Sequence, residues 1–107
     1  MSEIHISDFA RDVYEAVKKV PSGKVVTYAQ VALMSGHRGA ARAVGNALHV
    51  NPFYGIVPCH RVVNASGHLA KLFGFGGAAV QRGMLEKEGV KFKNDGTVDL
   101  NNYQWRG

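Results

Sequence analysis

Residues 27–51 read TYAQVALMSGHRGAARAVGNALHVN, and this stretch decides the fold. Its first four residues have the Ser/Thr-x-x-Glu/Gln form of a capping box, which predicts a helix from there through Met34. Gly36 is well placed to end that helix, and a second helix is expected from Ala40 to about Asn51. Two short helices joined by a glycine-containing turn are typical of a helix-turn-helix.

The second predicted helix has two different faces. One face is apolar and small, with Ala40, Ala41, Val44, Ala47 and Leu48. The other carries Arg42, Gly45, Asn46 and His49 at i, i+3, i+4 and i+7, which places them in one stripe. Such a stripe suits a close approach to DNA, although a plain solvated face fits the same pattern. Because glycine inside a helix costs about 0.5 to 1 kcal/mol relative to alanine, Gly45 requires a close-packing explanation.

Helical patterns also occur on both sides of this stretch. Toward the N-terminus, Ser7 is a plausible N-cap, and Phe9, Val13, Val17 and Val20 recur at helical spacing until Pro21-Ser22-Gly23 forms a turn. Toward the C-terminus, a helix is expected from Ala78 to Glu88, with Val80, Met84 and Leu85 facing inward and Gly89 ending it.

Short extended segments complete the pattern. Ile56-Val57 and Val62-Val63 are expected to be extended on either side of residues 58–61, and Asn94-Asp95-Gly96 predicts a hairpin turn between residues 90–92 and 97–100. The sequence therefore predicts one domain over residues 1–107, mainly α with short β-hairpin elements, of the winged helix-turn-helix class.

The 107 residues carry a net charge of +5, and its distribution is uneven. No Asp or Glu lies between residues 16 and 85, whereas this region contains Lys18, Lys19, Lys24, Arg38, Arg42, Arg61, Lys71 and Arg82. Such a surface attracts polyanions, although lysines often only solvate a face. No apolar stretch approaches the roughly 20 residues that span a bilayer and no signal peptide is evident, so we expect a cytoplasmic protein without a membrane partner.

Cys59 is the single cysteine, so it cannot form an internal disulfide. It is either a small buried hydrophobe or a reactive thiol, and a neighbouring base or cation, such as His60 or Arg61, would favour the second. Adjacent side chains often diverge, so the sequence alone leaves both open. The five histidines show no recognised ligand spacing, and we expect neither a metal nor an organic cofactor.

The segment Pro58-Cys59-His60-Arg61-Val62 resembles the active-site signature of the O6-alkylguanine-DNA alkyltransferases. Further stretches similar to this family, in the same order, are residues 21–25, 27–32, 40–45, 51–52 and 85–89. The resemblance implies direct repair, in which a monomer accepts one alkyl group from O6-alkylguanine in double-stranded DNA after the nucleotide is flipped out. It also implies that no cofactor takes part.

The resemblance implies roles for individual residues. Cys59 would take the alkyl group, with His60 and Glu88 activating its thiol through water and Asn51 bracing the turn. Arg42 would replace the extruded base, Tyr28 would help to turn the nucleotide, and Gly45 and Asn46 would lie on the helix in the minor groove. Val62 and Phe75 would line the guanine pocket. Arg61 matches the signature as a DNA-contact candidate, although a structural role suits it better.

Two departures from the family keep an alternative open. The chain begins almost at the first helix of the catalytic domain, and Leu72-Phe73-Gly74-Phe75-Gly76-Gly77 is an unusual pocket loop in which Phe75 lacks a tyrosine hydroxyl. Alkyltransferase-like proteins share the short form and a similar C-terminal segment, and flag lesions for nucleotide excision repair without reacting. They typically lack the cysteine that is present here. A sequence-specific helix-turn-helix regulator is disfavoured by the alanine- and glycine-rich second helix.

Overall fold

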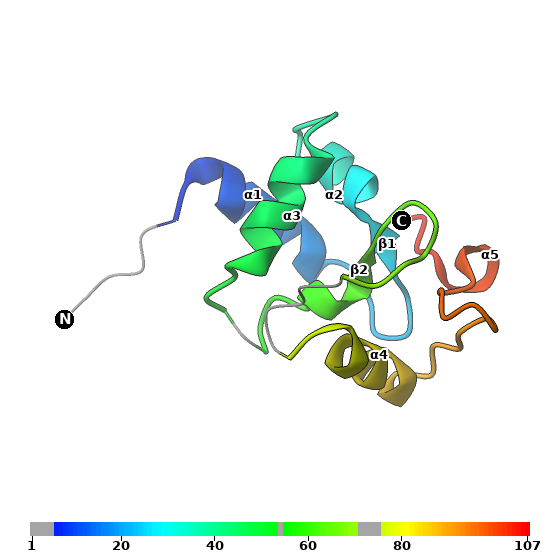
Figure 1. The fold of residues 1–107 in the computed structure, drawn as a ribbon. Helices are drawn as coiled ribbons and strands as arrows, with labels where there is room; N and C mark the ends of the chain where they lie inside the picture. Colours follow the sequence, from blue (N-terminus) through cyan, green and yellow to red (C-terminus); the bar gives the residue numbers. More distant parts are fainter. Residues whose placement is uncertain (1–5, 54, 71–75) are drawn as a thin grey trace.

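The computed structural model describes residues 6–53, 55–70 and 76–107. The elements, in chain order, are α1 (Asp8–Lys18), β1 (Val26–Thr27), α2 (Tyr28–Met34), α3 (Ala41–His49), the 3₁₀ turn η1 (Cys59–Arg61), β2 (Val62–Val63), α4 (Ala78–Lys87) and α5 (Leu100–Tyr103). Helices α1, α2 and α3 pack together on one side of the two strands, and α4 lies on the other side (Figure 1). The domain is mostly helical, as the sequence predicted.

Local hydrogen bonds explain where the first helices begin. The Ser7 side chain accepts from the Ala10 amide at the start of α1. At the start of α2 the Thr27 hydroxyl accepts from the Gln30 amide, and the Gln30 side chain accepts from the Thr27 amide, which forms the predicted capping box. Gly36, with a φ of 84°, adopts the left-handed conformation that ends α2. The predicted helix-turn-helix pair is confirmed.

Two hydrophobic clusters meet at the small sheet. Strands β1 and β2 pair in parallel, with Val26 opposite Val62. These two valines belong to the cluster of α1, α2 and α3, whereas Val25 and Val63 belong to the cluster of α4 and the C-terminal segment. Because successive side chains of a strand point to opposite faces, the sheet separates the helix-turn-helix from α4. Residues 58–62 therefore lie between two packed layers.

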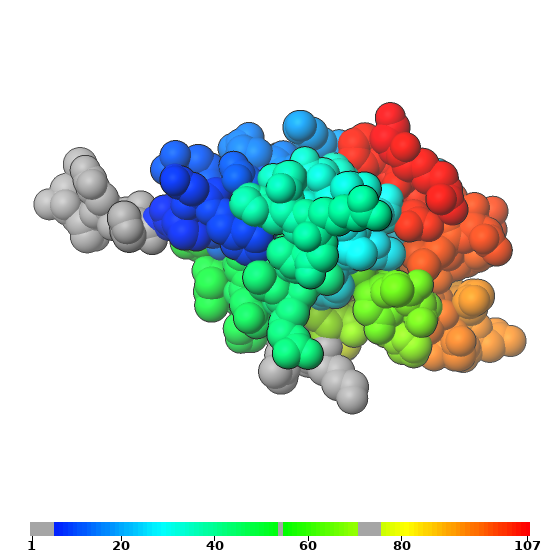
Figure 2. Space-filling view, turned by 90° about the horizontal axis from the view of Figure 1, so that it is seen from above, coloured from blue at the N-terminus to red at the C-terminus, as the bar shows by residue number. Residues whose placement is uncertain are grey.

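The C-terminal segment covers one end of this arrangement. Val25 and Trp105 are joined by a backbone hydrogen bond, and the Gln30 side chain donates to the Trp105 carbonyl at 2.8 Å. Figure 2 shows the red C-terminal residues beside the cyan residues of β1 and α2, away from the blue N-terminal end of α1. The sequence did not predict α5, which Asp99 caps by accepting from the Asn101 amide.

Three sequence expectations were wrong in detail. Residues Ile56 and Val57 are not extended, because both amides bond to the Phe53 carbonyl in a turn. The side chain of Val80 is exposed, whereas its neighbour Gln81 is fully buried beside Leu85. The expected hairpin after α4 keeps its turn but has a single bridge, between Phe92 and Val98, and the regular sheet is parallel.

Among the described residues, no helix is both long and apolar enough to cross a membrane. The same residues contain no group of three or more His, Cys, Asp or Glu side chains arranged to hold a metal ion.

Candidate active site and nucleic-acid interface

Residues 58–61, which we call the reactive turn, bring Cys59 to the interior. Cys59 begins the 3₁₀ turn η1 immediately before β2, and only 9% of its surface is exposed. Its amide donates to the Val57 carbonyl at 2.8 Å, and the Arg61 amide donates to the Pro58 carbonyl at 3.0 Å. These local bonds fix the backbone on which the thiol stands.

Burial raises the pKa of the Cys59 thiol above its ordinary value of 9.0. Hydrogen bonds from the Asn51 side chain and from the amides of Cys59 and His60 favour the thiolate and oppose this increase without reversing it. At neutral pH the resting side chain is therefore a thiol. A neighbouring base must remove its proton before it can act as a nucleophile.

Asn51 is bonded to the segment that leads into the reactive turn. Its side chain is buried, and its amide group donates to the Val57 carbonyl at 3.4 Å. Its carbonyl oxygen accepts from the Phe53 amide at 2.9 Å. One side chain thus links the end of α3 to the segment that carries Cys59.

His60 and Glu88 lie together, although 28 residues separate them in sequence. The Nε2 atom of His60 is 2.8 Å from Oε2 of Glu88, and both side chains are largely buried. Arg61 donates to the same carboxylate, with its Nη2 atom 2.7 Å from Oε2. The amide of Gly23 donates to the other carboxylate oxygen. Glu88, the C-cap residue of α4, therefore accepts from three residues that lie in two separate segments of the chain.

The environment of Glu88 fixes its charge. Burial raises the pKa of its carboxyl, but hydrogen bonds from Arg61, His60 and the Gly23 amide outweigh burial and lower the pKa from 4.5 to about 2. An ionised carboxylate only accepts hydrogen bonds, so the Nε2 atom of His60 must carry a proton. In the neutral ring this leaves Nδ1 unprotonated, which is the form that a general base requires.

The guanidinium of Arg61 is hydrogen-bonded within the protein. Besides its bonds to Glu88, its Nη1 atom donates to the Val20 carbonyl at 2.9 Å. The contacts of its guanidinium thus tie the end of α1, the reactive turn and the end of α4 together. These internal bonds fit the structural role that the sequence favoured for Arg61, and its DNA contact stays a prediction.

Helix α3 presents the predicted stripe at the surface. Arg42 and Asn46 are exposed, and no hydrogen bond or ion pair within the described chain holds either side chain. Behind them, a Cβ atom added to Gly45 would lie 3.8 Å from the ring of Tyr28. A contact at this distance is ordinary, so an alanine would fit beside the Tyr28 ring, and packing within the protein does not explain the glycine.

Tyr28 connects this stripe to the reactive turn. It is the first residue of α2 and is half-buried. The pKa of its hydroxyl is raised by burial and, secondarily, by the proximity of Cys59. Tyr28 is therefore close both to Gly45 on α3 and to Cys59.

Comparison with known proteins agrees with this geometry. The sequence model of the family described as 6-O-methylguanine DNA methyltransferase, DNA binding domain, matches residues 8–90. The chain belongs to this family. Methylated-DNA--protein-cysteine methyltransferases are similar to it, with 39% identity over 93 residues in Cricetulus griseus and 43% over 93 residues in Mycobacterium tuberculosis. These matches cover 86% of this chain and 44% and 54% of the relatives, so the chain spans about half of their length.

Solved structures of this family fall into two kinds. S. pombe Atl1 in complex with damaged DNA containing O6-carboxymethylguanine has a TM-score of 0.82 and 34% identity, and the match covers 97% of this chain and 100% of that chain. Mycobacterium tuberculosis OGT in complex with DNA has a TM-score of 0.71 and 42% identity, with 80% of this chain and 52% of that chain covered.

The residues that this family's signature predicted are thus largely brought together. Cys59, His60, Glu88, Asn51 and Val62 lie at the junction of the reactive turn with α4 and the sheet. Arg42, Gly45 and Asn46 lie on α3, and Phe75 lies outside the described residues. The role of each remains a prediction.

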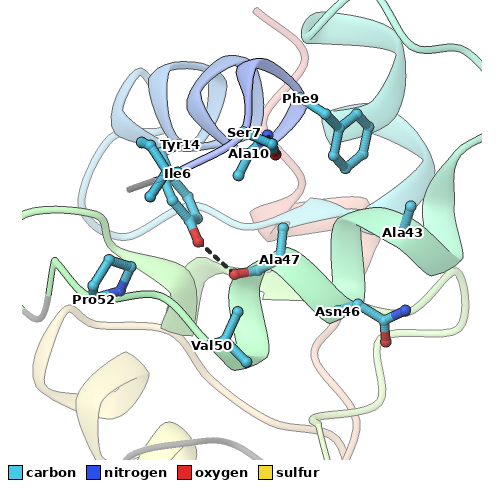
Figure 3. Close-up of a pocket in the computed structure, with 10 residues that line it drawn as sticks. All are labelled: Ile6, Ser7, Phe9, Ala10, Tyr14, Ala43, Asn46, Ala47, Val50 and Pro52. Carbon is cyan, nitrogen blue, oxygen red and sulfur yellow. Dashed lines mark hydrogen bonds between the residues drawn. The ribbon is translucent and has the colours of Figure 1, made fainter. Parts of the chain in front are cut away.

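Two buried residues near the site were missed by the sequence reasoning. Gln81 lies one turn before Leu85 and two turns before Glu88, so a polar residue on this inward face was a readable signal. Tyr14 donates its hydroxyl to the Ala47 carbonyl at 2.7 Å, and its pKa is raised by burial and by Cys59. Figure 3 shows this bond beneath an open groove of about 510 Å³ between α1 and α3, with Asn46 directed outward at its edge.

Proposed function

We propose that this domain repairs O6-alkylguanine in double-stranded DNA by transferring the alkyl group to Cys59. The observation that carries the proposal is the convergence of a buried thiol, a histidine and an ionised glutamate at one turn. Membership of the family and the named relatives support the same reaction. The activity would be a methylated-DNA-[protein]-cysteine S-methyltransferase, used once by each molecule.

The chemistry follows from these charges. Cys59 is a thiol at rest, so His60 would accept its proton through water while Glu88 holds the imidazole in the required tautomer. A bond forms between Sγ and the alkyl carbon as the bond from that carbon to guanine O6 breaks. The electron pair of that bond remains on guanine, which takes up one proton. The net proton transfer is therefore from the Cys59 thiol to guanine. Neither a cofactor nor an oxidant is needed for this balance.

DNA would bind through α3. Arg42, exposed and unpaired within the described residues, would fill the space left by the flipped nucleotide, and Tyr28 would turn the nucleotide toward Cys59. Flipping is required because the O6 substituent is not accessible within stacked DNA. Basic residues around the helix-turn-helix would contact phosphates without reading sequence, which suits a protein that searches all DNA.

The decisive test is mass spectrometry of the intact protein and its peptides after mixing with one equivalent of duplex containing O6-methylguanine. We expect a gain of one methyl group on the Cys59 peptide, stoichiometric with protein and absent with unmodified duplex. Cys59→Ala should still bind the lesion and gain nothing. Tight lesion binding without any mass change in the wild-type protein would contradict the proposal.

A second candidate is recognition of the lesion without transfer, followed by recruitment of nucleotide excision repair proteins. One observation favours it: the match to S. pombe Atl1 covers 97% of this chain with a TM-score of 0.82, whereas the match to Mycobacterium tuberculosis OGT covers 80% of this chain with a TM-score of 0.71. The retained Cys59 and its His60–Glu88 pair favour the transferase. The same mass measurement separates the two.

Further features belong to this proposal. We infer that residues 1–107 act as a monomeric single domain, because both hydrophobic clusters share one sheet and the reaction needs one thiol. The turn Lys93–Gly96 and the Phe92–Val98 bridge are our candidate for the wing of a winged helix. A single unpaired cysteine suits the reducing cytoplasm.

A further inference from the structure

Gln81 is a fully buried polar side chain at the back of the reactive turn. Its side-chain amide donates to the carbonyl of His60 at 3.1 Å and to the carbonyl of Val62 at 3.0 Å. Its oxygen accepts from the Ala70 amide at 2.9 Å. One side chain of α4 thus bonds the backbone on both sides of Arg61 and the backbone that follows β2.

The placement of Gln81 on α4 gives this contact a mechanical meaning. Gln81, Leu85 and Glu88 are spaced i, i+4 and i+7, so they lie on one face of the helix. Leu85 fills the cluster beneath the sheet, while Gln81 holds the backbone carbonyl of His60 and Glu88 holds its imidazole. Residues of α4 therefore fix His60 both at its backbone carbonyl and at its imidazole ring.

Burial of an amide is costly unless its groups are bonded, and an apolar residue at this place would avoid that cost. Here both amide protons and the oxygen have partners, so the side chain is ordered by three bonds. Carbonyl groups pointing toward α4 at His60 and Val62 would lose their partners if Gln81 were apolar. The backbone of the reactive turn would then be free to move relative to Glu88.

We propose that Gln81 is a positioning residue, whose donor groups fix the reactive turn against α4 so that His60 and Cys59 keep the geometry needed for alkyl transfer, while its oxygen separately anchors Ala70. This inference rests on the proposed function of Cys59. The NH₂ group of Gln81 thus holds the reactive turn, and its oxygen holds Ala70. Substitutions can test the two functions separately.

Three variants of Gln81 separate the donor function of its side-chain amide from the acceptor function. Gln81→Lys keeps a donor for the carbonyls and removes the acceptor, Gln81→Glu keeps the acceptor and removes donors, and Gln81→Met removes both at similar size. Gln104→Met is the matched control, because Gln104 also uses its side-chain amide in an internal bond, which goes to Gln30 of α2 and not to the reactive turn. Thermal unfolding of each variant defines a temperature at which all are folded.

The first readout is the single-turnover rate of methyl transfer at saturating lesion duplex, beside the lesion Kd. We expect Gln81→Met and Gln81→Glu to slow transfer roughly tenfold to a hundredfold without weakening lesion binding, because small displacements of reacting groups have effects of that size. Gln81→Lys should restore most of the rate. Equal rates in Gln81→Met and wild type, or a Gln81→Lys variant as slow as Gln81→Met, would overturn the proposal. If Gln81→Met does not fold, the transfer rates of Gln81→Lys and Gln81→Glu are compared with each other, and that comparison decides.

The second readout needs no DNA and separates this inference from the proposed function. The rate of Cys59 alkylation by iodoacetamide is followed against pH, and hydrogen exchange is measured at the Ala70 amide. Loss of donors should change the pH profile of Cys59, and loss of the acceptor should speed exchange at Ala70 alone. If wild type never accepts a methyl group, the proposed function fails, whereas unchanged profiles and unchanged exchange in all three variants would reject the positioning role itself.

Discussion

The reactive turn and the α3 stripe differ in how their side chains are held. At the reactive turn, His60 and Arg61 are both bonded to Glu88, and further bonds join this group to the backbone of Val20 and Gly23 in the segment after α1. On α3, the side chains of Arg42 and Asn46 lie at the surface with no internal partner in the described structure. Tyr28 lies near both regions, beside Gly45 and close to Cys59.

The difference arises because the reactive turn must be ordered before the substrate binds, whereas the α3 side chains find their partner only in DNA. A group that moves a proton must already be oriented when the substrate arrives, because reorganisation during the reaction raises the barrier. A side chain that enters DNA exchanges its contacts with water for contacts with DNA only on binding. Hydrogen bonds within the protein would compete with those DNA contacts. We therefore expect substitutions at the reactive turn to alter stability and rate together, and substitutions on α3 to alter function alone.

The largest expected effect is at Glu88. Replacing it with glutamine removes the anion that selects the tautomer of His60, and we expect methyl transfer to slow roughly a hundredfold. Loss of charged hydrogen bonds to Arg61 and His60 should also lower the free energy of unfolding by about 1.5 to 3 kcal/mol. Single-turnover kinetics and urea denaturation measure the two effects. Glu86→Gln, on the exposed face of the same helix, is the control.

The pH dependence of stability tests the same carboxylate. Its pKa in the folded protein is about 2, below the ordinary 4.5, so its stabilising contribution is complete above about pH 4.5 and is lost as the pH falls toward 2. The difference in unfolding free energy between wild type and Glu88→Gln should therefore be greater at pH 7 than at pH 3. A difference that stays constant over this range would contradict the assigned charge state.

A smaller effect, confined to function, is expected at Arg42. Arg42→Ala should slow methyl transfer about tenfold, because filling the gap offsets part of the few kcal/mol that nucleotide flipping costs. Its unfolding free energy should match wild type within about 0.5 kcal/mol, as for other exposed sites. Arg42→Lys keeps the charge and tests whether the shape of the guanidinium matters, and Arg11→Ala removes an exposed arginine from α1. An Arg42→Ala variant that is unstable or fully active would break the contrast between the two regions.

The sequence predicted the parts of this molecule that depend on local chemistry. The Thr27–Gln30 capping box, the caps at Ser7 and Gly36 and the two faces of α3 each depend on residues within one or two turns. The family resemblance placed Cys59, His60, Asn51 and Glu88 in one site, which periodicity could not have done, because Glu88 lies far along the chain from Cys59.

Other features could not be predicted because they depend on long-range contacts. The parallel pairing of β1 with β2 joins residues 36 positions apart, and nothing local specifies it: Val26 pairs with Val62. The burial of Gln81 in place of Val80 is decided by carbonyl groups of the reactive turn that need donors. Arg61 faces inward because Glu88 and the Val20 carbonyl meet there. In the last two cases a polar group in a distant segment determined which side chain became buried.

The smallest expected effect is at Gly45, and it sharpens the account of α3. The backbone of Gly45 is helical with a negative φ, and an added Cβ would contact the Tyr28 ring at an ordinary 3.8 Å. Gly45→Ala should therefore stabilise the protein by about 0.5 to 1 kcal/mol, through the helix propensity of alanine, and raise the Tm by a few degrees. Gly45→Leu should displace the Tyr28 ring and weaken lesion binding. If the alanine variant is already defective in lesion binding while more stable than wild type, DNA itself must approach the Cα of Gly45, and the glycine is required by the minor groove rather than by Tyr28.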